Sequence, residues 1–225
     1  MRTLITGSSQ GLGLELKRTL LAAGQDVLEF DHSHGNDVRD PQRTFGDCPP
    51  DVRTIINCAG VNKTNWLENV TDAEWDDVMD TNAKGIFKMT QWALPHLINH
   101  RGTVVNIVSN AAHVPMTCSA AYNASKGAAH ILTLQLAREL TKKYGITVFG
   151  VAPNKMAGTG MSKDIERQVV EQRGWTPEQA QAYQLAALLP GEETPPKAVA
   201  EFIAFLLSER YRHKYLSGTV IPYGA

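Results

Sequence analysis

The stretch TLITGSSQGLG, residues 3–13, joins an apolar segment to the start of a helix through a glycine-rich turn. The apolar segment predicts a strand, and a helical pattern continues to about Ala23. In this context Gly7 can make the tight turn, Gly11 lets the backbone approach a phosphate, and Gly13 permits close packing of helix on strand. The helix N-terminus would then present free N–H groups to a pyrophosphate. An ordinary strand-to-helix loop is the alternative, but the position after the first strand favours a dinucleotide site.

Strands and helices alternate along the rest of the chain. This alternation predicts a parallel sheet with helices on both faces, and the apolar character of the strands fits burial on both sides. The sequence therefore predicts one doubly wound α/β domain. The expected strands are residues 3–6, 26–30, 53–57, 103–109, 146–152 and 218–222, and the expected helices are residues 11–23, two stretches between 71 and 99, residues 121–144, and one after Pro196. Thr71 and Glu74 are spaced as a capping box for the first of the two stretches.

Composition indicates an ordinary globular protein. The chain has 225 residues, of which 43% are hydrophobic and 20% charged, with a net charge of −1. No nucleic-acid or membrane partner is expected from that charge, and no apolar run approaches the roughly 20 residues that span a bilayer. The first ten residues do not resemble a signal peptide. Three scattered cysteines, Cys48, Cys58 and Cys118, suggest reduced thiols and a cytoplasmic location.

The second expected strand is followed by an acidic residue, Asp31. A carboxylate at this place can accept hydrogen bonds from the adenosine ribose and would repel a 2′-phosphate, so we expect NAD in preference to NADP. Gln10, just before Gly11, is neutral, which supports the same preference. A solvated loop aspartate is the alternative. His32 and His34 lack further ligands nearby, so no metal site is expected.

The stretch AYNASKGAAH, residues 121–130, holds Tyr122 and Lys126 among small side chains. Residues four apart lie on one face of a helix. A neighbouring cation can lower the pKa of a tyrosine and allow it to exchange protons near neutral pH. The alternative is a helix start with an exposed lysine and a half-buried tyrosine.

Together these motifs resemble the short-chain dehydrogenase/reductase family. The glycine turn matches its TGxxxGxG pattern, NCAG at residues 57–60 resembles its NNAG, and Tyr122 and Lys126 match YxxxK. Asn82 and Ser109 stand where the family keeps an active-site asparagine and serine, Ser109 being thirteen residues before the tyrosine. The matches follow in order along nearly the whole chain. The resemblance implies a single Rossmann-type domain over residues 1–225.

The resemblance also implies catalytic roles. Tyr122 would be the general acid in carbonyl reduction and the base in alcohol oxidation. Lys126 would hold the nicotinamide ribose and favour the phenolate, and Ser109 would bind the substrate oxygen. Asn82 would anchor a water that links Lys126 to solvent. Taken singly, Ser109 could cap a strand end and Asn82 could be a helix-bending polar residue.

The resemblance further implies a dinucleotide site, with NAD expected and NADP as the alternative. Its residues would be Gly7, Ser9, Gln10, Gly11, Leu12, Gly13, Asp31, Asp37, Val38, Asn57, Ala59, Gly60, Tyr122, Lys126 and Pro153.

The chain departs from the family pattern in two places. The stretch between Asp31 and Asn57 is short, so the family's third strand and its neighbouring helix are expected to be trimmed. Asn154 stands where the family commonly has glycine, and Thr159 comes one place later than the usual threonine. Contacts to the nicotinamide carboxamide are therefore less defined than contacts to adenosine.

The predicted activity is hydride transfer between nicotinamide and an alcohol/carbonyl substrate. A sugar-nucleotide epimerase or reductase of the related extended group and a catalytically silent cofactor-binding regulator are the alternatives. Residues 111–119 and 154–191 are expected to wall the substrate site. The second segment holds Met156, Met161, Trp175 and Tyr183, and it is expected to form an apolar, mobile lid. A homodimer or homotetramer is expected to form through residues 82–99 and 121–144.

Overall fold

A six-stranded sheet of order β2-β1-β3-β4-β5-β6 forms the centre of the molecule, and each neighbouring pair of strands is parallel. The computed structural model describes residues 2–186, 188–208 and 214–224. Within them the predicted doubly wound α/β fold is confirmed. The strands are β1 (Arg2–Thr6), β2 (Asp26–Phe30), β3 (Val52–Asn57), β4 (Thr103–Ile107), β5 (Thr147–Pro153) and β6 (Val220–Tyr223).

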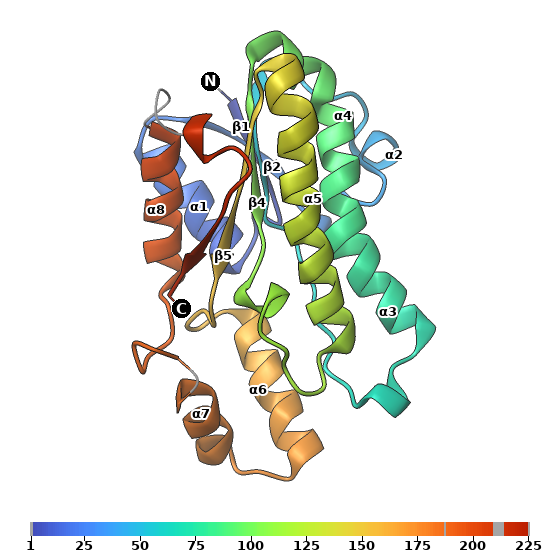
Figure 1. Cartoon of the computed structure of the whole chain (residues 1–225), viewed down its shortest axis with the longest axis vertical. Helices are drawn as coiled ribbons and strands as arrows, with labels where there is room; N and C mark the ends of the chain where they lie inside the picture. Colours follow the sequence, from blue (N-terminus) through green and yellow to red (C-terminus); the bar gives the residue numbers. More distant parts are fainter. Residues whose placement is uncertain (1, 187, 209–213, 225) are drawn as a thin grey trace.

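Helices cover both faces of this sheet (Figure 1). On one face lie α1 (Gly11–Ala22) and α8 (Pro196–Ser208), and on the other α4 (Gly85–His100) and α5 (Ala120–Tyr144). The remaining α-helices of the described residues are α2 (Pro41–Phe45), α3 (Asp72–Met79), α6 (Gly160–Arg173) and α7 (Pro177–Ala186). None of the helices that the structure describes is both long and apolar enough to cross a membrane.

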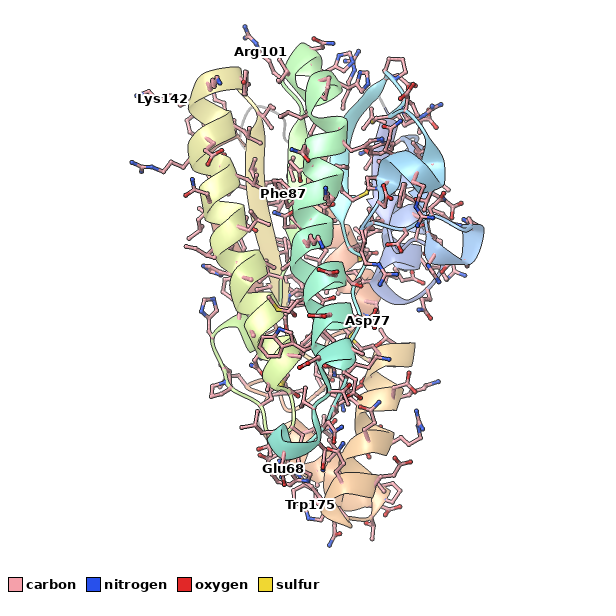
Figure 2. All side chains as sticks on the ribbon, turned by 90° about the vertical axis from the view of Figure 1, so that its right-hand side faces the viewer. Glu68, Asp77, Phe87, Arg101, Lys142 and Trp175 are labelled. Atoms are coloured by element: carbon pink, nitrogen blue, oxygen red, sulfur yellow. The ribbon has the colours of Figure 1, made fainter. Side chains whose placement is uncertain are left out.

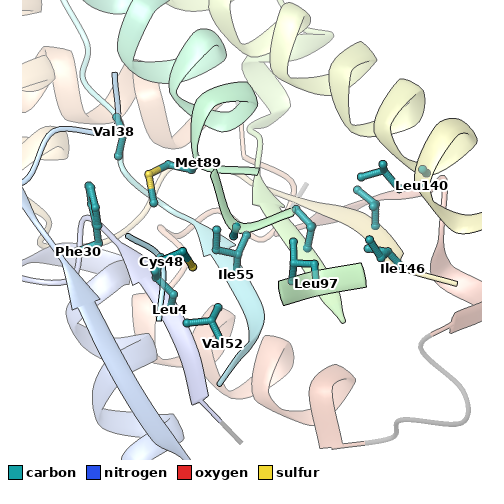
Figure 3. Close-up of a cluster of buried hydrophobic side chains, with 14 residues drawn as sticks. Leu4, Phe30, Val38, Cys48, Val52, Ile55, Met89, Leu97, Leu140 and Ile146 are labelled. Carbon is teal, nitrogen blue, oxygen red and sulfur yellow. The ribbon is translucent and has the colours of Figure 1, made fainter. Parts of the chain in front are cut away.

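The strands are apolar on both sides because each face of the sheet has its own core. In β1, Leu4 belongs to a buried cluster with Met89 and Leu97 of α4, shown in Figure 3. The next residue, Ile5, belongs to the opposite cluster with Leu16 of α1. Successive side chains of a strand point to opposite faces, so an unbroken apolar run can fill two cores.

The expected shortening after β2 is confirmed. Between β2 and β3 the chain forms a single 3-10 turn, His32–His34, and the five-residue helix α2, with no further strand among these described residues. Its last residue, Phe45, packs on Phe30 and Trp92, with ring centroids 5.5 and 5.7 Å away. The Trp92 indole N–H also donates to the carbonyl of Gly46 at 2.9 Å. This aromatic cluster packs the short segment after β2 against α4, at the edge of the sheet where a longer chain would add another strand.

The capping box predicted at Thr71 and Glu74 is present at the start of α3. The structure adds a feature that periodicity did not predict, a π-helical turn at Asp80–Lys84 between α3 and α4. Such turns occur often at functional sites, because the extra residue re-aims nearby side chains.

Residues 154–191 contain no strand among the described positions, as expected, but they do contain α6 and α7. These two helices project below the sheet in Figure 1. Figure 2 shows Trp175, between α6 and α7, at the same end of the molecule as Glu68, opposite to the end that carries Arg101 and Lys142.

The strand order reverses between β1 and β3, because the chain leaves β1 for β2 on one side and then crosses to β3 on the other. The carboxyl ends of parallel strands meet at one edge of the sheet. A reversal of this kind opens a crevice there, which is where doubly wound proteins bind ligands.

Candidate active site

A cavity of about 500 Å³ opens at the carboxyl edge of the sheet. It brings together fifteen of the residues predicted from sequence. They are Gly7, Ser9, Gln10, Gly11, Leu12, Gly13, Asp31, Asp37, Val38, Ala59, Gly60, Ser109, Tyr122, Lys126 and Pro153. Two predicted residues, Asn57 and Asn82, do not line it.

The glycine turn has the backbone geometry that the sequence implied. Gly7 and Gly11 have φ values of 70° and 52°, which side-chain-bearing residues rarely adopt. A Cβ atom on Gly7 would lie 2.8 Å from Ala59 Cα, and one on Gly13 would lie 1.9 Å from the carbonyl oxygen of Gly7. A Cβ on Gly11 would meet only the side chain of Thr159, at 3.6 Å. The turn is therefore packed tightly on its protein side, with backbone N–H groups of the α1 N-terminus beside the cavity.

Asp31, at the end of β2, is held in place by hydrogen bonds. Its carboxylate accepts the backbone N–H of Ser9 at 2.9 Å, and both the N–H and the hydroxyl of Ser33, at 2.9 and 2.7 Å. Burial raises its pKa, but these hydrogen bonds outweigh burial and bring it down to about 2. Asp31 is therefore an anion at any physiological pH.

Arg39 lines the cavity beside the predicted pair Asp37 and Val38, and sequence reasoning missed it. Its guanidinium forms a bidentate ion pair with Asp37, at 2.7 and 2.9 Å, and also reaches Asp77 at 3.3 Å. Its hydrogen bonds to Asp37 hold the pKa of that carboxyl below its usual range. Asp77 is labelled on α3 in Figure 2. The sequence signal that could have identified Arg39 is its position, as a basic residue directly after Asp37 and Val38.

The loop after β3 is tied to β1 by the Thr6 hydroxyl. Thr6 Oγ1 accepts the backbone N–H groups of Cys58 and Ala59 at 2.9 and 3.0 Å. Asn57 turns away from the cavity, because its Nδ2 donates to Asn106 Oδ1 of β4 at 2.8 Å. The structure thus brings Ala59 and Gly60 to the site and places the Asn57 side chain inside the fold.

Asn82 lies in the π-helical turn and is only 1% exposed. Its Oδ1 accepts the N–H of Val61 at 2.8 Å, and its Nδ2 donates to the Val61 carbonyl and to Ser125 Oγ. The side chain therefore clamps the loop after β3 against α5. A Cβ on Gly60 would lie 3.2 Å from Asn82 Oδ1 and 3.8 Å from Lys126 Nζ, so Asn82 lies directly behind two residues that line the cavity, Gly60 and Lys126.

Lys126 is buried on α5, with 6% of its surface exposed. Its Nζ donates to the carbonyl of Ile107, at the end of β4, over 3.0 Å. Burial lowers its pKa to about 8, and Cys58 opposes this only in part. The ammonium lies 5.7 Å from the centroid of the Tyr122 ring, as the shared helix face predicted.

The prediction that Lys126 lowers the pKa of Tyr122 is wrong for the protein chain by itself. Tyr122 is 8% exposed, and burial raises its pKa, while a hydrogen bond with Ser109 offsets only part of the rise. Transfer of a phenolate into a poorly solvated site is costly, and the lysine, turned toward Ile107, does not compensate. Tyr122 is therefore a protonated phenol at neutral pH.

Ser109 follows β4 and caps the short turn Asn110–Ala112. Its Oγ accepts the N–H of Ala111 at 3.2 Å and faces Asn110 Oδ1 at 3.4 Å. On the other side of the cavity the end of β5 contributes Pro153 and Asn154. The predicted serine, tyrosine and lysine thus reach one cavity from β4 and α5.

The expected apolar lid contributes in part. Met156 and Met161 line the cavity. Trp175 and Tyr183 do not, because their rings pack on the Arg173 guanidinium, which lies 4.7 and 5.0 Å from the two ring centroids. No local pattern distinguished the two methionines from the two aromatic residues.

Comparison with known families identifies relatives of the whole chain. The family model described as short chain dehydrogenase matches residues 27–170. The chain is 33% identical to a 3-oxoacyl-(acyl-carrier-protein) reductase of Staphylococcus aureus, over 97% of this chain and 94% of the relative. It is 32% identical to 2-(S)-hydroxypropyl-CoM dehydrogenase 3 of Xanthobacter autotrophicus, over 92% and 89% of the two chains. A human (3R)-3-hydroxyacyl-CoA dehydrogenase is also 32% identical, over 77% of this chain and 60% of that protein.

Solved structures show the same fold. A variant of actinorhodin polyketide ketoreductase with NADPH superposes with a TM-score of 0.82 and 24% identity, covering 98% of this chain and 94% of that one. Levodione reductase superposes with a TM-score of 0.79 and 23% identity, covering 99% and 95%. At these identities the superpositions concern the arrangement of the backbone only.

Proposed function

The chain belongs to the short-chain dehydrogenase family, and we propose from that premise that it reduces a carbonyl to an alcohol with a nicotinamide dinucleotide. One observation carries the proposal: Ser109, Tyr122 and Lys126 line the same cavity as the glycine turn and Asp31. A chain that only bound the dinucleotide would need Lys126 for the nicotinamide ribose, but it would not need a buried phenol and a hydroxyl in the same cavity.

The residues present fit a dinucleotide. A Cβ on Gly13 would overlap the Gly7 carbonyl, so the turn has the close packing that a pyrophosphate cradle needs. Asp31 would hold the adenosine ribose, Val38 would lie against adenine, and Lys126 would hold the nicotinamide ribose. When bound, the dinucleotide supplies the hydride.

Tyr122 donates the proton in the proposed reaction. Its O–H bond breaks, and the proton passes to the substrate oxygen as the carbonyl becomes an alcohol. Because burial raises the Tyr122 pKa, the phenol holds its proton at neutral pH, which is the form that a general acid needs. Ser109 donates a hydrogen bond to the same oxygen and stabilises the charge that develops on it. To stabilise the phenolate that remains, the Lys126 ammonium would turn from the Ile107 carbonyl toward the Tyr122 ring, whose centroid lies 5.7 Å away.

We propose NAD as the preferred dinucleotide. Asp31 is ionised at physiological pH and would repel a 2′-phosphate. Arg39 could neutralise such a phosphate, but its guanidinium is already paired with Asp37 and Asp77. One structural neighbour was solved with NADPH, so NADP is the alternative that the binding measurement must compare.

The names of the relatives supply the first substrates to test. They are 3-oxoacyl, 3-hydroxyacyl and 2-hydroxypropyl compounds joined to acyl carrier protein, CoA or CoM. We therefore propose 3-oxoacyl thioesters as the first panel. The three free cysteines support the proposed cytoplasmic location.

A homodimer or homotetramer through α4 and α5 is also proposed. Phe87 of α4 and Ile131 of α5 are 42% and 62% exposed. Figure 2 shows Phe87 on α4, beside α5. Sedimentation that finds only a 24.7 kDa species at micromolar concentration would contradict this proposal.

The Tyr122→Phe variant tests the proposed reaction. Only a hydroxyl is removed, so the fold and dinucleotide binding should persist, while turnover should fall by about 10²–10⁴-fold, the usual contribution of a positioned acid. Turnover is followed by the absorbance of the reduced nicotinamide. Tyr144→Phe, at the far end of α5, removes the same hydroxyl outside the cavity and should leave turnover unchanged.

The same assay separates the alternatives. Tight dinucleotide binding by the wild-type chain without turnover of any carbonyl would indicate a regulator. Conversion of a sugar nucleotide with no net change in nicotinamide absorbance would indicate an epimerase. Near-wild-type reduction by Tyr122→Phe would overturn the role given to this tyrosine.

A further inference from the structure

Asn154 replaces the expected glycine after Pro153, and the backbone fixes how its carboxamide is oriented. Asn154 Oδ1 accepts the N–H of Lys155 at 2.9 Å, and Asn154 Nδ2 donates to the carbonyl of Gly224 at 3.0 Å. A backbone N–H can only donate and a carbonyl can only accept. The oxygen and the nitrogen of this amide therefore cannot exchange places without losing both bonds.

The orientation of Asn154 determines that of Asn110. Asn110 Nδ2 donates to Asn154 Oδ1 over a short 2.7 Å. Asn110 Oδ1 must then face the other way, and it lies 3.4 Å from Ser109 Oγ. An amide oxygen has no hydrogen, so Ser109 is the donor in this contact. The hydrogen bonds therefore all have the same direction: Ser109 donates to Asn110, Asn110 donates to Asn154, and Asn154 donates to Gly224.

The far end of this chain of hydrogen bonds is rigid. Gly224 has φ of 75°, and a Cβ at this position would lie 2.1 Å from Thr194 Oγ1. The backbone N–H of Asn154 also donates to the carbonyl of Tyr223 at 3.0 Å. The end of β6 therefore gives Asn154 a fixed support.

We propose that Asn154 is a positioning residue for Ser109 and that it acts through Asn110. This inference rests on the proposed function, in which Ser109 binds the substrate oxygen. The strong 2.7 Å bond keeps Asn110 in place, whereas the 3.4 Å contact to Ser109 is weak. The weak contact thus keeps the hydrogen of the Ser109 hydroxyl near the position from which it would bind the substrate oxygen. That oxygen can then replace Asn110 Oδ1 as the acceptor. Together with the Ala111 N–H, this contact limits the rotation of the hydroxyl.

Asn154→Ala and Asn110→Ala test the proposal in steady-state assays with saturating dinucleotide. Each variant should lower kcat by about three- to tenfold, the worth of one hydrogen bond, and leave the dinucleotide dissociation constant nearly unchanged. Asn154→Ala also loses the bonds to Lys155 and Gly224, so its Tm should fall, whereas the Tm of Asn110→Ala should stay closer to that of the wild type. The double variant should lose no more than the single variants, because both act through one contact. In a Ser109→Ala background Asn154→Ala should have no further effect. Asn99→Ala removes an exposed amide at the end of α4, far from the cavity, and should change nothing.

Several outcomes would overturn the inference. Additive losses, or a loss in Asn154→Ala with none in Asn110→Ala, would mean that Asn154 acts on the C-terminal strand and not on Ser109. An unchanged kcat in both variants would also overturn it. If Asn154→Ala does not fold, Asn110→Ala alone decides, since within the described residues the hydrogen bonds of its carboxamide go to Ser109 and Asn154. Failure of the proposed function is distinct, because then Ser109→Ala itself would leave turnover unaltered.

Discussion

The helix that carries the glycine turn and the helix that covers the substrate side of the cavity are built in opposite ways. Helix α1 buries four of its twelve residues, whereas α6 buries only one of its fourteen. The turn before α1 is packed by backbone atoms, with no room for a Cβ on Gly13. Helix α6 is attached to the loop after β3 by side chains: Gln168 accepts the N–H of Thr64, and Gln172 donates to its carbonyl.

The different packing of α1 and α6 indicates which part of the cavity must be rigid. A dinucleotide must be held in one place for hydride transfer, and close-packed backbone provides that fixed position. A substrate must enter and leave, and a few exchangeable side-chain hydrogen bonds allow local opening at low cost. The two regions should therefore respond differently to small changes.

The largest effect is expected from Gly13→Ala. The added methyl group would meet the Gly7 carbonyl at 1.9 Å, and the contact is with backbone, which cannot rotate away. We expect loss of dinucleotide binding and a free energy of unfolding lower by about 3 kcal/mol, the upper end for overpacking. Titration calorimetry and denaturant unfolding measure the two quantities.

Gly127→Ala is the matched control. It lies inside α5 with nothing within 4 Å of the new Cβ, so it should stabilise the protein slightly. Normal dinucleotide binding by Gly13→Ala would show that the turn is not the rigid element of the comparison.

A smaller effect is expected from Asp31→Asn, which removes one charge and, because both Asp31 oxygens accept backbone N–H groups, one of these hydrogen bonds as well. The ratio of the NADP to the NAD dissociation constant should fall by about ten- to a hundredfold, because the repulsion of a 2′-phosphate and a charged hydrogen bond are both lost. Since the lowered pKa of Asp31 is about 2, the carboxylate keeps its charge from about pH 4 upward, and its contribution to the wild-type preference should weaken only as pH falls below that value. The preference should also weaken as pH falls through about 6, because the 2′-phosphate then takes up its second proton.

Asp26→Asn, at the exposed start of the same strand, is the control for charge and should leave the ratio unaltered. Tighter binding of NADP than of NAD by the wild-type chain would refute the preference.

The smallest effect is expected from removing the attachment of α6, in the double variant Gln168→Ala, Gln172→Ala. Two neutral hydrogen bonds to Thr64 are lost, so hydrogen exchange in α6 should rise by about three- to tenfold and the substrate KM should increase. The dinucleotide dissociation constant should not change. Gln181→Ala, an exposed glutamine of α7, should have no effect. Global destabilisation by the double variant would mean that α6 belongs to the rigid core.

Local stretches of sequence were enough to predict much of the fold and of the site. Gly7 and Gly13 have roles that depend on neighbours within a few residues, and the spacing of Tyr122 and Lys126 places them on one helix face. The trimmed segment after β2 followed from the shortness of the stretch between Asp31 and Asn57 compared with the family pattern. These features depend on local backbone geometry, which sequence motifs of a few residues can indicate.

Partners that are distant in sequence were not predictable. Asn57 bonds to Asn106 inside the fold instead of facing the cavity, and Asn110 bonds to Asn154, forty-four residues away. Both pairings depend on which strands become neighbours in the sheet. The π-helical turn around Asn82 likewise depends on packing against Val61 and Ser125.

The sequence by itself determined the glycine turn, the order of the strands along the chain, and the presence of a serine, a tyrosine and a lysine in the family's spacing. The direction in which the pKa values of the tyrosine and the lysine move came from the tertiary structure alone: burial raises the pKa of Tyr122 and lowers that of Lys126, the reverse of what a solvent-exposed pair would show. The physical reason is desolvation. Spacing along a helix fixes the distance between two side chains, but the cost of a charge depends on how much water the whole fold leaves around it.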